Sequence, residues 1–350
     1  MGPVPNLLEI ARNPIAYTAA RWTPTQRTLE RATLSSVVMS VVIVATGGAV
    51  RLTGSGLGCE TWPKCGDDSL TATPEMGVHG AIEFGNRMLT YVLCAAVGWA
   101  IVAARSARPE RRGLSRLAWA QFWLVAANGV IGGITVLTEL NPYTVAGHFL
   151  LAMTLLTVCT VTWLRAREGD AEPRPLVDTT ARRLTAALTV SSAVLVALGT
   201  VVTGSGPHAG DSSDVPRMPV DEALAARVHS VAAWLVIALT VALWLALRPS
   251  GTAHGPRART RELFLVLLAQ GVIGYVQYFT DLPEILVGLH LFGSTLVWIA
   301  VLRVVLSLRE RGLPGAAPVP ERDAGADDGA DGSGSGDAAA AAQPVATSGT

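Results

Sequence analysis

Eight long apolar stretches, separated by polar connections, dominate the pattern of hydrophobic and polar positions along this chain. Each is close to the length of about 20 residues that a helix needs to cross the hydrocarbon core of a membrane. The pattern therefore predicts an all-α polytopic membrane protein with eight transmembrane helices. The stretches lie at residues 33–52, 84–104, 116–137, 145–164, 184–204, 226–247, 262–280 and 285–308.

The composition agrees with this interpretation. Half of the 350 residues are hydrophobic and only 15% are charged, whereas soluble domains carry about 25% charged residues. The 27 basic residues balance the 27 acidic ones, so the chain has no overall positive charge with which to attract nucleic acid. These values exclude most soluble enzymes, nucleic-acid binders and disordered scaffolds.

The arginines predict the orientation of the helices. Alternate connections are rich in arginine, and the connections between them are acidic. The second connection carries Arg105, Arg108, Arg111, Arg112 and Arg116, and the first carries Glu60, Asp67, Asp68 and Glu75. Because arginine-rich connections stay inside, we expect a multi-pass protein of the bacterial plasma membrane with both termini in the cytoplasm.

The chain contains an internal repeat. The sequence Thr-Gly-Ser-Gly occurs at 53–56 and at 203–206, and GVIG occurs at 129–132 and at 271–274. His148 and His290 each lie 19 residues after the first glycine of a GVIG motif. Four stretches separate the copies, so both insert in the same sense. The repeat predicts two tandem four-helix bundles related by a pseudo-two-fold axis along the membrane normal.

The predicted domains follow from this repeat. A cytoplasmic leader (1–32) precedes the N-terminal half (33–165), and a cytoplasmic linker (166–183) joins it to the C-terminal half (184–308). Residues 313–350 are rich in Ala, Gly and Asp. Such a segment has too few apolar side chains to offset the entropy lost on folding, so we expect a disordered cytoplasmic tail.

Three histidines lie near the outer ends of predicted helices: His148, His229 and His290. In the repeat, His229 falls opposite Asn86, and Glu83 lies one turn before Asn86. Ionisable groups inside a membrane are costly and usually functional, although a histidine can also simply bond to a neighbouring helix. Imidazoles on two facing helices can hold a haem iron from both sides, whereas zinc usually needs further ligands.

Each of the other polar residues near the outer face has two possible roles. Cys59 and Cys65 lie in the first outer loop, where an oxidising compartment permits a disulfide or a redox-active pair. Arg51 and Arg87 either extend to the membrane surface or pair with the propionates of a haem. His208 is a loop residue or part of a lid.

Six segments together resemble the haem A synthase family, membrane enzymes that oxidise haem O to haem A for cytochrome oxidase. The resemblance covers residues 33–308 and is specific. Its segments are GGAVRLTGSGLGCETWPKC at 47–65, IEFGNRM at 82–88, AGHFLLA at 146–152, GTVVTGSGPHAG at 199–210, RVHSVAAW at 227–234 and GLHLFGSTLVW at 288–298.

The resemblance implies that His229 and His290 bind the iron of a haem b cofactor in the C-terminal half. It implies that the N-terminal half receives haem O, with Glu83 as the important acid and His148 as the ligand of the substrate iron. The implied reaction converts the C8 methyl group of haem O into a formyl group by two successive hydroxylations. Haem O synthase is the implied source of substrate. The sequence leaves the electron donor and a homo-oligomeric state open.

One position departs from the family. Many members have histidine at the place of Asn86, within an E-x-x-H-R pattern that here reads Glu83-Phe-Gly-Asn86-Arg87. Asparagine is a poor iron ligand, so we expect His148 alone to hold the substrate iron, with water on the Asn86 side. His79, two turns before Asn86, is the alternative second ligand.

Two other functions compete with this interpretation. A cytochrome b-like membrane electron carrier without haem-modifying activity explains His229 and His290, but not Glu83. A transporter built from repeats usually has its site near the membrane midplane, whereas the polar residues here lie toward the outer ends.

Overall fold

The computed structural model describes residues 13–248 and 254–312. Within them, eight helices are long and apolar enough to cross a membrane, which confirms the prediction of an all-α polytopic membrane protein. They are α3 (Gln26–Leu52), α4 (Gly77–Ser106), α5 (Arg112–Leu137), α6 (Pro142–Ala166), α7 (Thr179–Ser205), α8 (Glu222–Ala246), α9 (His254–Phe279) and α10 (Glu284–Ser307). The predicted disordered tail lies outside the described residues.

Four shorter elements accompany these helices at their ends. Helix α2 (Pro14–Arg21) precedes α3, and the 3-10 helix η1 (Pro74–Met76) leads directly into α4. Strands β1 (Arg174–Pro175) and β2 (Arg309–Glu310) pair antiparallel, so the connection between α6 and α7 is tied to the segment that follows α10.

Polar residues immediately before the apolar runs fix where several helices begin. The side chain of Asn141 accepts a hydrogen bond from the backbone N–H of Tyr143, and Pro142 occupies the first turn of α6. Asp178 and Asp221 cap α7 and α8 in the same way. Each cap pairs an N–H that has no partner inside the helix, and a proline in the first turn loses no helical hydrogen bond.

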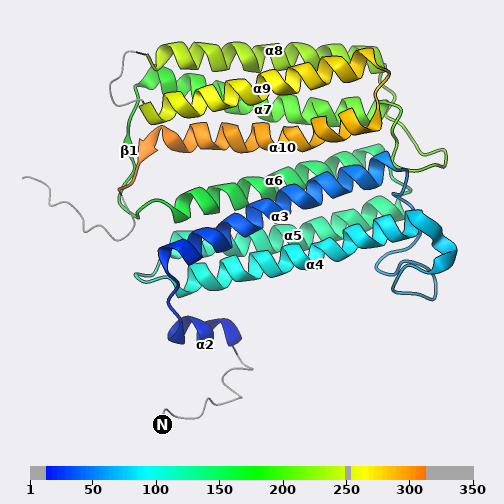
Figure 1. The fold of residues 1–350 in the computed structure, drawn as a ribbon, viewed down its shortest axis with the longest axis horizontal. Coiled ribbons are helices and arrows are strands. Elements are labelled where there is room, and N and C mark those ends of the chain that lie inside the picture. Colours follow the sequence, from blue (N-terminus) through cyan, green and yellow to red (C-terminus); the bar gives the residue numbers. More distant parts are fainter. Residues whose placement is uncertain (1–12, 249–253, 313–350) are drawn as a thin grey trace, which may run out of the picture. The chain divides into compact units, whose positions relative to one another are not determined.

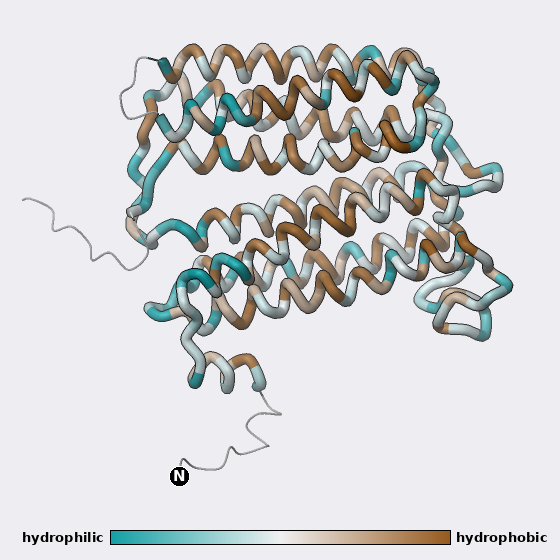
Figure 2. Tube along the Cα trace, viewed as in Figure 1, coloured by the Kyte–Doolittle hydropathy of each residue, from teal (hydrophilic) through white to brown (hydrophobic). Residues whose placement is uncertain are grey.

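The helices form two groups of four, α3–α6 and α7–α10 (Figure 1). Each group has its own cluster of buried apolar side chains. The groups meet where α10 packs against α3 and α6, and where α6 packs against α7. Hydrophobic residues predominate along the length of the helices, and hydrophilic residues gather at the ends and connections (Figure 2). Many large apolar side chains are exposed, as expected for helices that face lipid.

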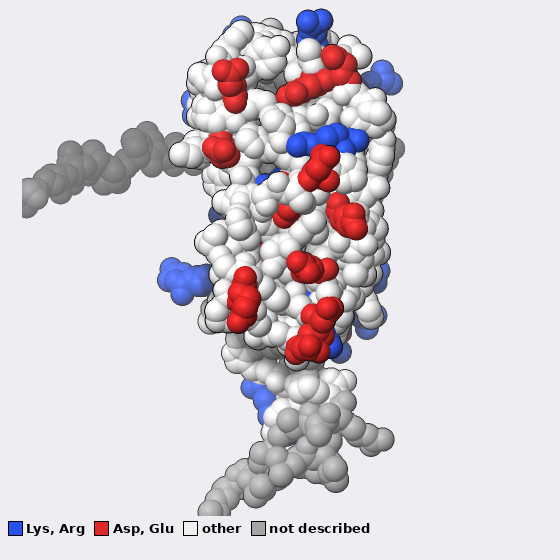
Figure 3. Space-filling model, turned by 90° about the vertical axis from the view of Figure 1, so that its right-hand side faces the viewer, with Lys and Arg blue, Asp and Glu red and all other residues white. Residues whose placement is uncertain are grey.

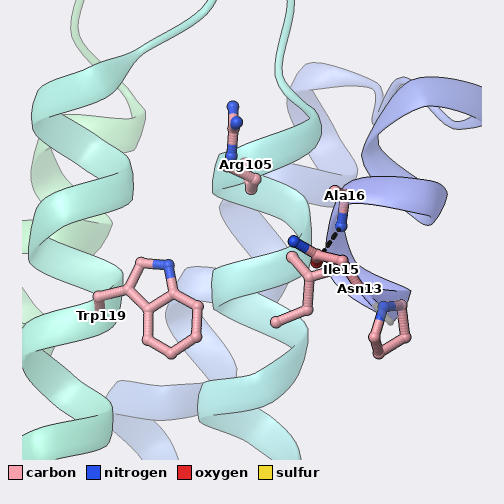
Figure 4. A pocket seen from close by; sticks show the side chains of 6 residues that line it. Asn13, Ile15, Ala16, Arg105 and Trp119 are labelled. Carbon is pink, nitrogen blue, oxygen red and sulfur yellow. Dashed lines mark hydrogen bonds between the residues drawn. The ribbon is translucent and has the colours of Figure 1, made fainter. Parts of the chain in front are cut away.

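Four connections, which follow α3, α5, α7 and α9, lie together at one end of the helices. We call this the outer end, because the charge pattern predicts that it faces outward. Viewed from that side, acidic side chains are prominent on the surface (Figure 3). A pocket at the other end is lined by Asn13, Pro14, Ile15, Ala16, Arg105 and Trp119 (Figure 4), and it includes none of the predicted site residues.

The end of α3 and the first Thr-Gly-Ser-Gly segment contact the end of α7 and the loop after it, and so join the two groups at the outer end. Gly56 N–H donates to the Gly210 carbonyl (2.7 Å), and Ser55 pairs with Asp211 in an isolated antiparallel bridge. Arg51 Nη2 on α3 donates to the Thr203 carbonyl on α7 (2.6 Å). We call this set of contacts the outer joint.

Candidate functional site

In the second group of helices, His229 on α8 and His290 on α10 lie face to edge. Their ring centroids are 6.4 Å apart, and the ring planes are inclined by 71°. Metal–imidazole bonds are about 2 Å long, so two rings that share one metal ion have centroids on the order of 6 Å apart. The separation of the two rings therefore fits an iron held between them.

Each of the three predicted histidine ligands lies against a glycine on a neighbouring helix. A Cβ atom added to Gly199 would lie 3.3 Å from Cε1 of His229, and one added to Gly274 would lie 3.2 Å from Cε1 of His290. Carbon atoms pack best at about 3.5–4.0 Å, so even alanine would crowd the rings. These glycines let the imidazoles approach the backbones of α7 and α9.

His148 on α6 also lies against a glycine of a neighbouring helix; we call such a glycine the seat of the histidine. A Cβ on Gly132 of α5 would lie 3.2 Å from its Cε1. Gly132 and Gly274 are the last glycines of the two GVIG motifs. The repeated motif thus marks the seats of His148 and His290, which explains their equal spacing from it.

All three histidines share a second feature: their Nδ1 atoms are buried and make no hydrogen bond within the described residues. The backbone carbonyls of Leu195 and Gln270 interact with His229 and His290 outside strict hydrogen-bond geometry. A metal-binding histidine usually turns its second nitrogen toward such a carbonyl. The arrangement leaves Nε2 as the atom available to a metal.

Among the described residues, no group of three or more His, Cys, Asp or Glu side chains could hold a metal ion. A haem iron takes four of its ligands from the porphyrin and needs only axial ligands from the protein. The facing pair His229 and His290, with buried Nδ1 atoms and glycine seats, therefore fits a haem and not an isolated zinc ion.

The first group of helices differs at the position matching His229. Asn86 accepts a hydrogen bond from the Thr46 hydroxyl on α3 (2.7 Å). In the register of the Thr-Gly-Ser-Gly repeat, Ala49 takes the place of Gly199. Both the histidine and the glycine that would receive it are therefore replaced, while the His148 seat is kept.

Glu83 lies one turn before Arg87 on α4 and is buried, with 5% of its surface exposed. Its Oε2 accepts from the backbone N–H of Cys59 (2.7 Å), and its Oε1 accepts from Arg87 Nε (3.0 Å) and Nη2. A buried carboxylate requires such partners. Glu83 is thus fixed between its own helix and the first outer loop.

Arg87 binds the first outer loop as well as Glu83. Its Nη1 donates to the carbonyls of Thr61 (3.1 Å) and Lys64 (2.9 Å), and its Nη2 donates to the Cys59 carbonyl (3.3 Å). With the two bonds to Glu83, these contacts occupy the five N–H groups of the guanidinium. No N–H of Arg87 is left over for a haem propionate in this arrangement.

The loop that Arg87 holds is closed by a disulfide between Cys59 and Cys65, which confirms the predicted bond. Both cysteines are fully buried. Arg51, the other predicted propionate partner, has one side-chain hydrogen bond among the described residues, from Nη2 to the Thr203 carbonyl, and so keeps donors for an anion.

The remaining outer histidines bond to loops. His79 shares a hydrogen bond between its Nδ1 and the Ser55 hydroxyl (2.9 Å), and His208 Nε2 lies 2.9 Å from the Leu282 carbonyl. Asp211 accepts from the N–H groups of Leu57 (3.2 Å) and Ser213 (2.8 Å). Burial opposes ionisation of Asp211, but these bonds and His79 outweigh it and lower its pKa.

Sequence reasoning missed two residues at the outer end. Arg217 donates to the carbonyls of Gly206 and Pro207 (2.6 Å to Pro207) and lies near Arg51. Its signal was an arginine in an otherwise acidic outer loop. Trp62 lies against Gly133 of α5; its signal was the pair Gly132-Gly133, which reads Gly274-Tyr275 in the second copy.

Comparisons with known proteins agree with this arrangement. The chain is similar to the Heme A synthase of Geobacillus thermodenitrificans, with 30% identity over 150 residues, 41% of this chain and 46% of that protein. For the Heme A synthase of Symbiobacterium thermophilum the identity is 29% over 156 residues, 43% of this chain and 50% of that protein. For the Heme A synthase of Methylobacterium nodulans the identity is 28% over 302 residues, which are 69% of this chain and 81% of that protein.

The chain thus spans about half the length of the first two of these relatives. The family model COX15-CtaA, described as cytochrome oxidase assembly protein, matches residues 30–302. That match takes in all eight membrane-spanning helices, apart from the ends of the first and last. The chain therefore belongs to the COX15-CtaA family of cytochrome oxidase assembly proteins.

Proposed function

We propose that this protein is a haem A synthase, an oxidoreductase that converts the C8 methyl group of haem O into a formyl group for cytochrome oxidase. The main support for the proposal is that the two bundles differ in their buried histidine and glutamate side chains. One bundle has two facing imidazoles, His229 and His290, and the other has a single seated imidazole, His148, with a buried carboxylate, Glu83. The names of the similar proteins support it.

The second bundle is the proposed site of haem b, held through His229 and His290. Bound there, haem b supplies one-electron transfer. Conversion of a methyl into a formyl group removes four electrons from one carbon, so a resident electron carrier suits the reaction. The chain's own contribution is to fix both rings against Gly199 and Gly274 and to surround them with apolar helices.

The first bundle is the proposed site of the substrate, haem O. His148 holds the substrate iron from one side, and Asn86, engaged with Thr46, leaves the other side to water. Glu83 is the proposed group that orients substrate or moves a proton. Hydrogen bonds from Cys59 and Arg87 hold its carboxyl group in a fixed position, as a group that moves a proton requires.

The two arginines take different roles in this proposal. Arg51 keeps free N–H donors at the outer joint, beside Arg217, and we assign it to a propionate. Arg87 was expected to do the same, but its donors all go to Glu83 and the first outer loop. We therefore assign Arg87 to holding Glu83 and that loop in place.

The cellular setting is proposed on the same basis. The protein lies in the bacterial plasma membrane with both termini in the cytoplasm, and haem O synthase supplies its substrate. The acidic outer end and the arginine-rich opposite end support this orientation.

Co-expression with a haem O synthase, followed by extraction of pigments from aerobically grown cells, tests the proposal. We expect haem A in cells that carry this protein and only haem O in cells that lack it. Protein that binds haem b but yields no haem A while haem O is present would contradict the proposal and favour a cytochrome b-like carrier.

A further inference from the structure

Trp62 of the first outer loop and His148 of α6 lie against neighbouring glycines of α5. The Trp62 ring lies where a side chain on Gly133 would be: a Cβ there would lie 2.6 Å from Cε2 and 2.8 Å from Cγ. His148 rests on Gly132, the preceding residue. An aromatic side chain from the first outer loop and the imidazole of the first bundle therefore lie against consecutive residues of the same helix.

The loop that carries Trp62 is held on both sides of it. The carbonyls of Thr61 and Lys64, which flank the Trp62-Pro63 pair, both accept from Arg87 Nη1 on α4. The disulfide between Cys59 and Cys65 closes the segment. The loop thus crosses from α4 to α5 at the outer end and connects Glu83 with the neighbourhood of His148.

The second bundle closes the same place without a loop. Tyr275 matches Gly133 in the repeat, as His290 matches His148. The Tyr275 hydroxyl on α9 accepts from Trp234 Nε1 on α8 (3.0 Å) and lies 3.2 Å from the Ser230 hydroxyl. A residue of the helix itself therefore bridges α8 and α9, whereas the gap between α4 and α5 is bridged by a loop residue.

We propose that Trp62 is a substrate-binding residue, which closes the outer end of the gap between α4 and α5 over haem O. This inference rests on the proposed function, in which the first bundle receives haem O. The side chain of a loop residue can turn aside without repacking the helices, so it suits a group that must enter and leave. Tyr275, built into α9, suits a group that stays bound.

The chemistry of the substrate fits this assignment. Haem O presents a flat aromatic macrocycle, and an indole ring stacks on such a surface or meets its edge. Trp62 is only partly covered by the protein, with 40% of its surface exposed. The ring therefore has free surface for a ligand while it stays anchored on Gly133.

The test is titration of purified protein, loaded with haem b, with haem O, followed by absorbance. We expect Trp62→Ala to raise the dissociation constant for haem O roughly tenfold and to raise KM, while kcat and the content of haem b stay the same. Trp62→Phe should keep most of the affinity, because it retains an aromatic ring.

Two glycine variants make a matched pair. Gly133→Ala puts a methyl group into the Trp62 ring and should weaken haem O binding as Trp62→Ala does. Gly129→Ala, one turn earlier on α5, adds a methyl group where no atom lies within 4 Å and should leave binding unchanged. Retained haem b shows in each variant that the protein has folded.

Unchanged haem O affinity in both Trp62→Ala and Gly133→Ala would overturn the inference, as would equal weakening by Gly129→Ala. A wild-type protein that binds haem O but forms no haem A would instead refute the proposed function. The two failures are distinguishable because the second is visible before any residue is changed.

Discussion

The two bundles share one architecture but differ at matched positions on facing helices. The second bundle has His229 with Gly199 as its seat, and the first has Asn86 with Ala49. Both changes remove the same ligand, since a ring in place of Asn86 would have to meet the Ala49 methyl group. The difference shows that the two bundles are not interchangeable: one offers two facing imidazoles at this position, and the other offers one.

The outer loops sharpen this contrast. In the first bundle, a disulfide-closed loop is bound to Glu83 and Arg87 and places Trp62 on α5. In the second bundle, Tyr275 makes the corresponding bridge between helices. This contrast is the one that the proposed function requires, with substrate exchange in the first bundle and a resident haem in the second.

Removal of an imidazole from the second bundle should have the largest effect. We expect His229→Ala or His290→Ala to abolish most haem b binding, because each variant deletes one of two axial ligands. Haem content of the purified protein, measured by absorbance, checks this. His254→Ala, at an exposed position where α9 begins, is the control. Full haem content in both ligand variants would refute the assignment.

Neutralising Glu83 should separate the two bundles functionally. Glu83→Gln keeps the shape of the side chain but removes its charge, so haem b should remain while haem A formation falls by about a hundredfold or more. Pigment analysis during co-expression with haem O synthase measures both. Glu75→Gln, an exposed carboxylate near the start of α4, should have no effect, and normal activity of Glu83→Gln would exclude a catalytic role.

A smaller effect is expected from filling a histidine seat. Gly274→Ala places a methyl group 3.2 Å from His290 Cε1, and the resulting overpacking should weaken haem b binding roughly tenfold. Gly271→Ala in the same GVIG motif meets no atom within 4 Å and serves as the matched control. Equal haem affinity in the two variants would show that the seat does not matter.

The smallest effect is expected from substitutions that give the first bundle the residues of the second. Asn86→His alone should not create a paired-imidazole site, because Ala49 occupies the matching seat. The double variant Ala49→Gly/Asn86→His should create one and give a second low-spin haem spectrum when haem O is added. A low-spin spectrum from the single variant would show that the glycine seat is dispensable there.

The sequence predicted those features that depend on local pattern or on the repeat. Hydropathy located the eight helices, and the two GVIG motifs with their histidines identified matching positions. The pairing of Cys59 with Cys65 was also expected, because the two cysteines share one short loop. Glu83 lies just before the predicted stretch 84–104, but inside α4, which begins at Gly77.

Contacts between distant segments were not predictable in the same way. Arg87 was expected either to extend to the membrane surface or to pair with a propionate, and the sequence did not indicate its bonds to Glu83 and to the carbonyls of Cys59, Thr61 and Lys64. Which of these groups an arginine meets depends on how the loop folds back over α4. Trp62 was missed for the same reason, because its seat on Gly133 lies about 70 residues away in the chain.

The outer joint restricts how the two bundles move as rigid bodies. A backbone hydrogen bond from Gly56 to Gly210, the bridge between Ser55 and Asp211, and the bond from Arg51 to Thr203 would all have to break if one bundle rocked against the other. Transporters built from repeats depend on such rocking. A joint of this kind instead favours a fixed frame, so exchange of the proposed substrate would depend on local movements within one bundle.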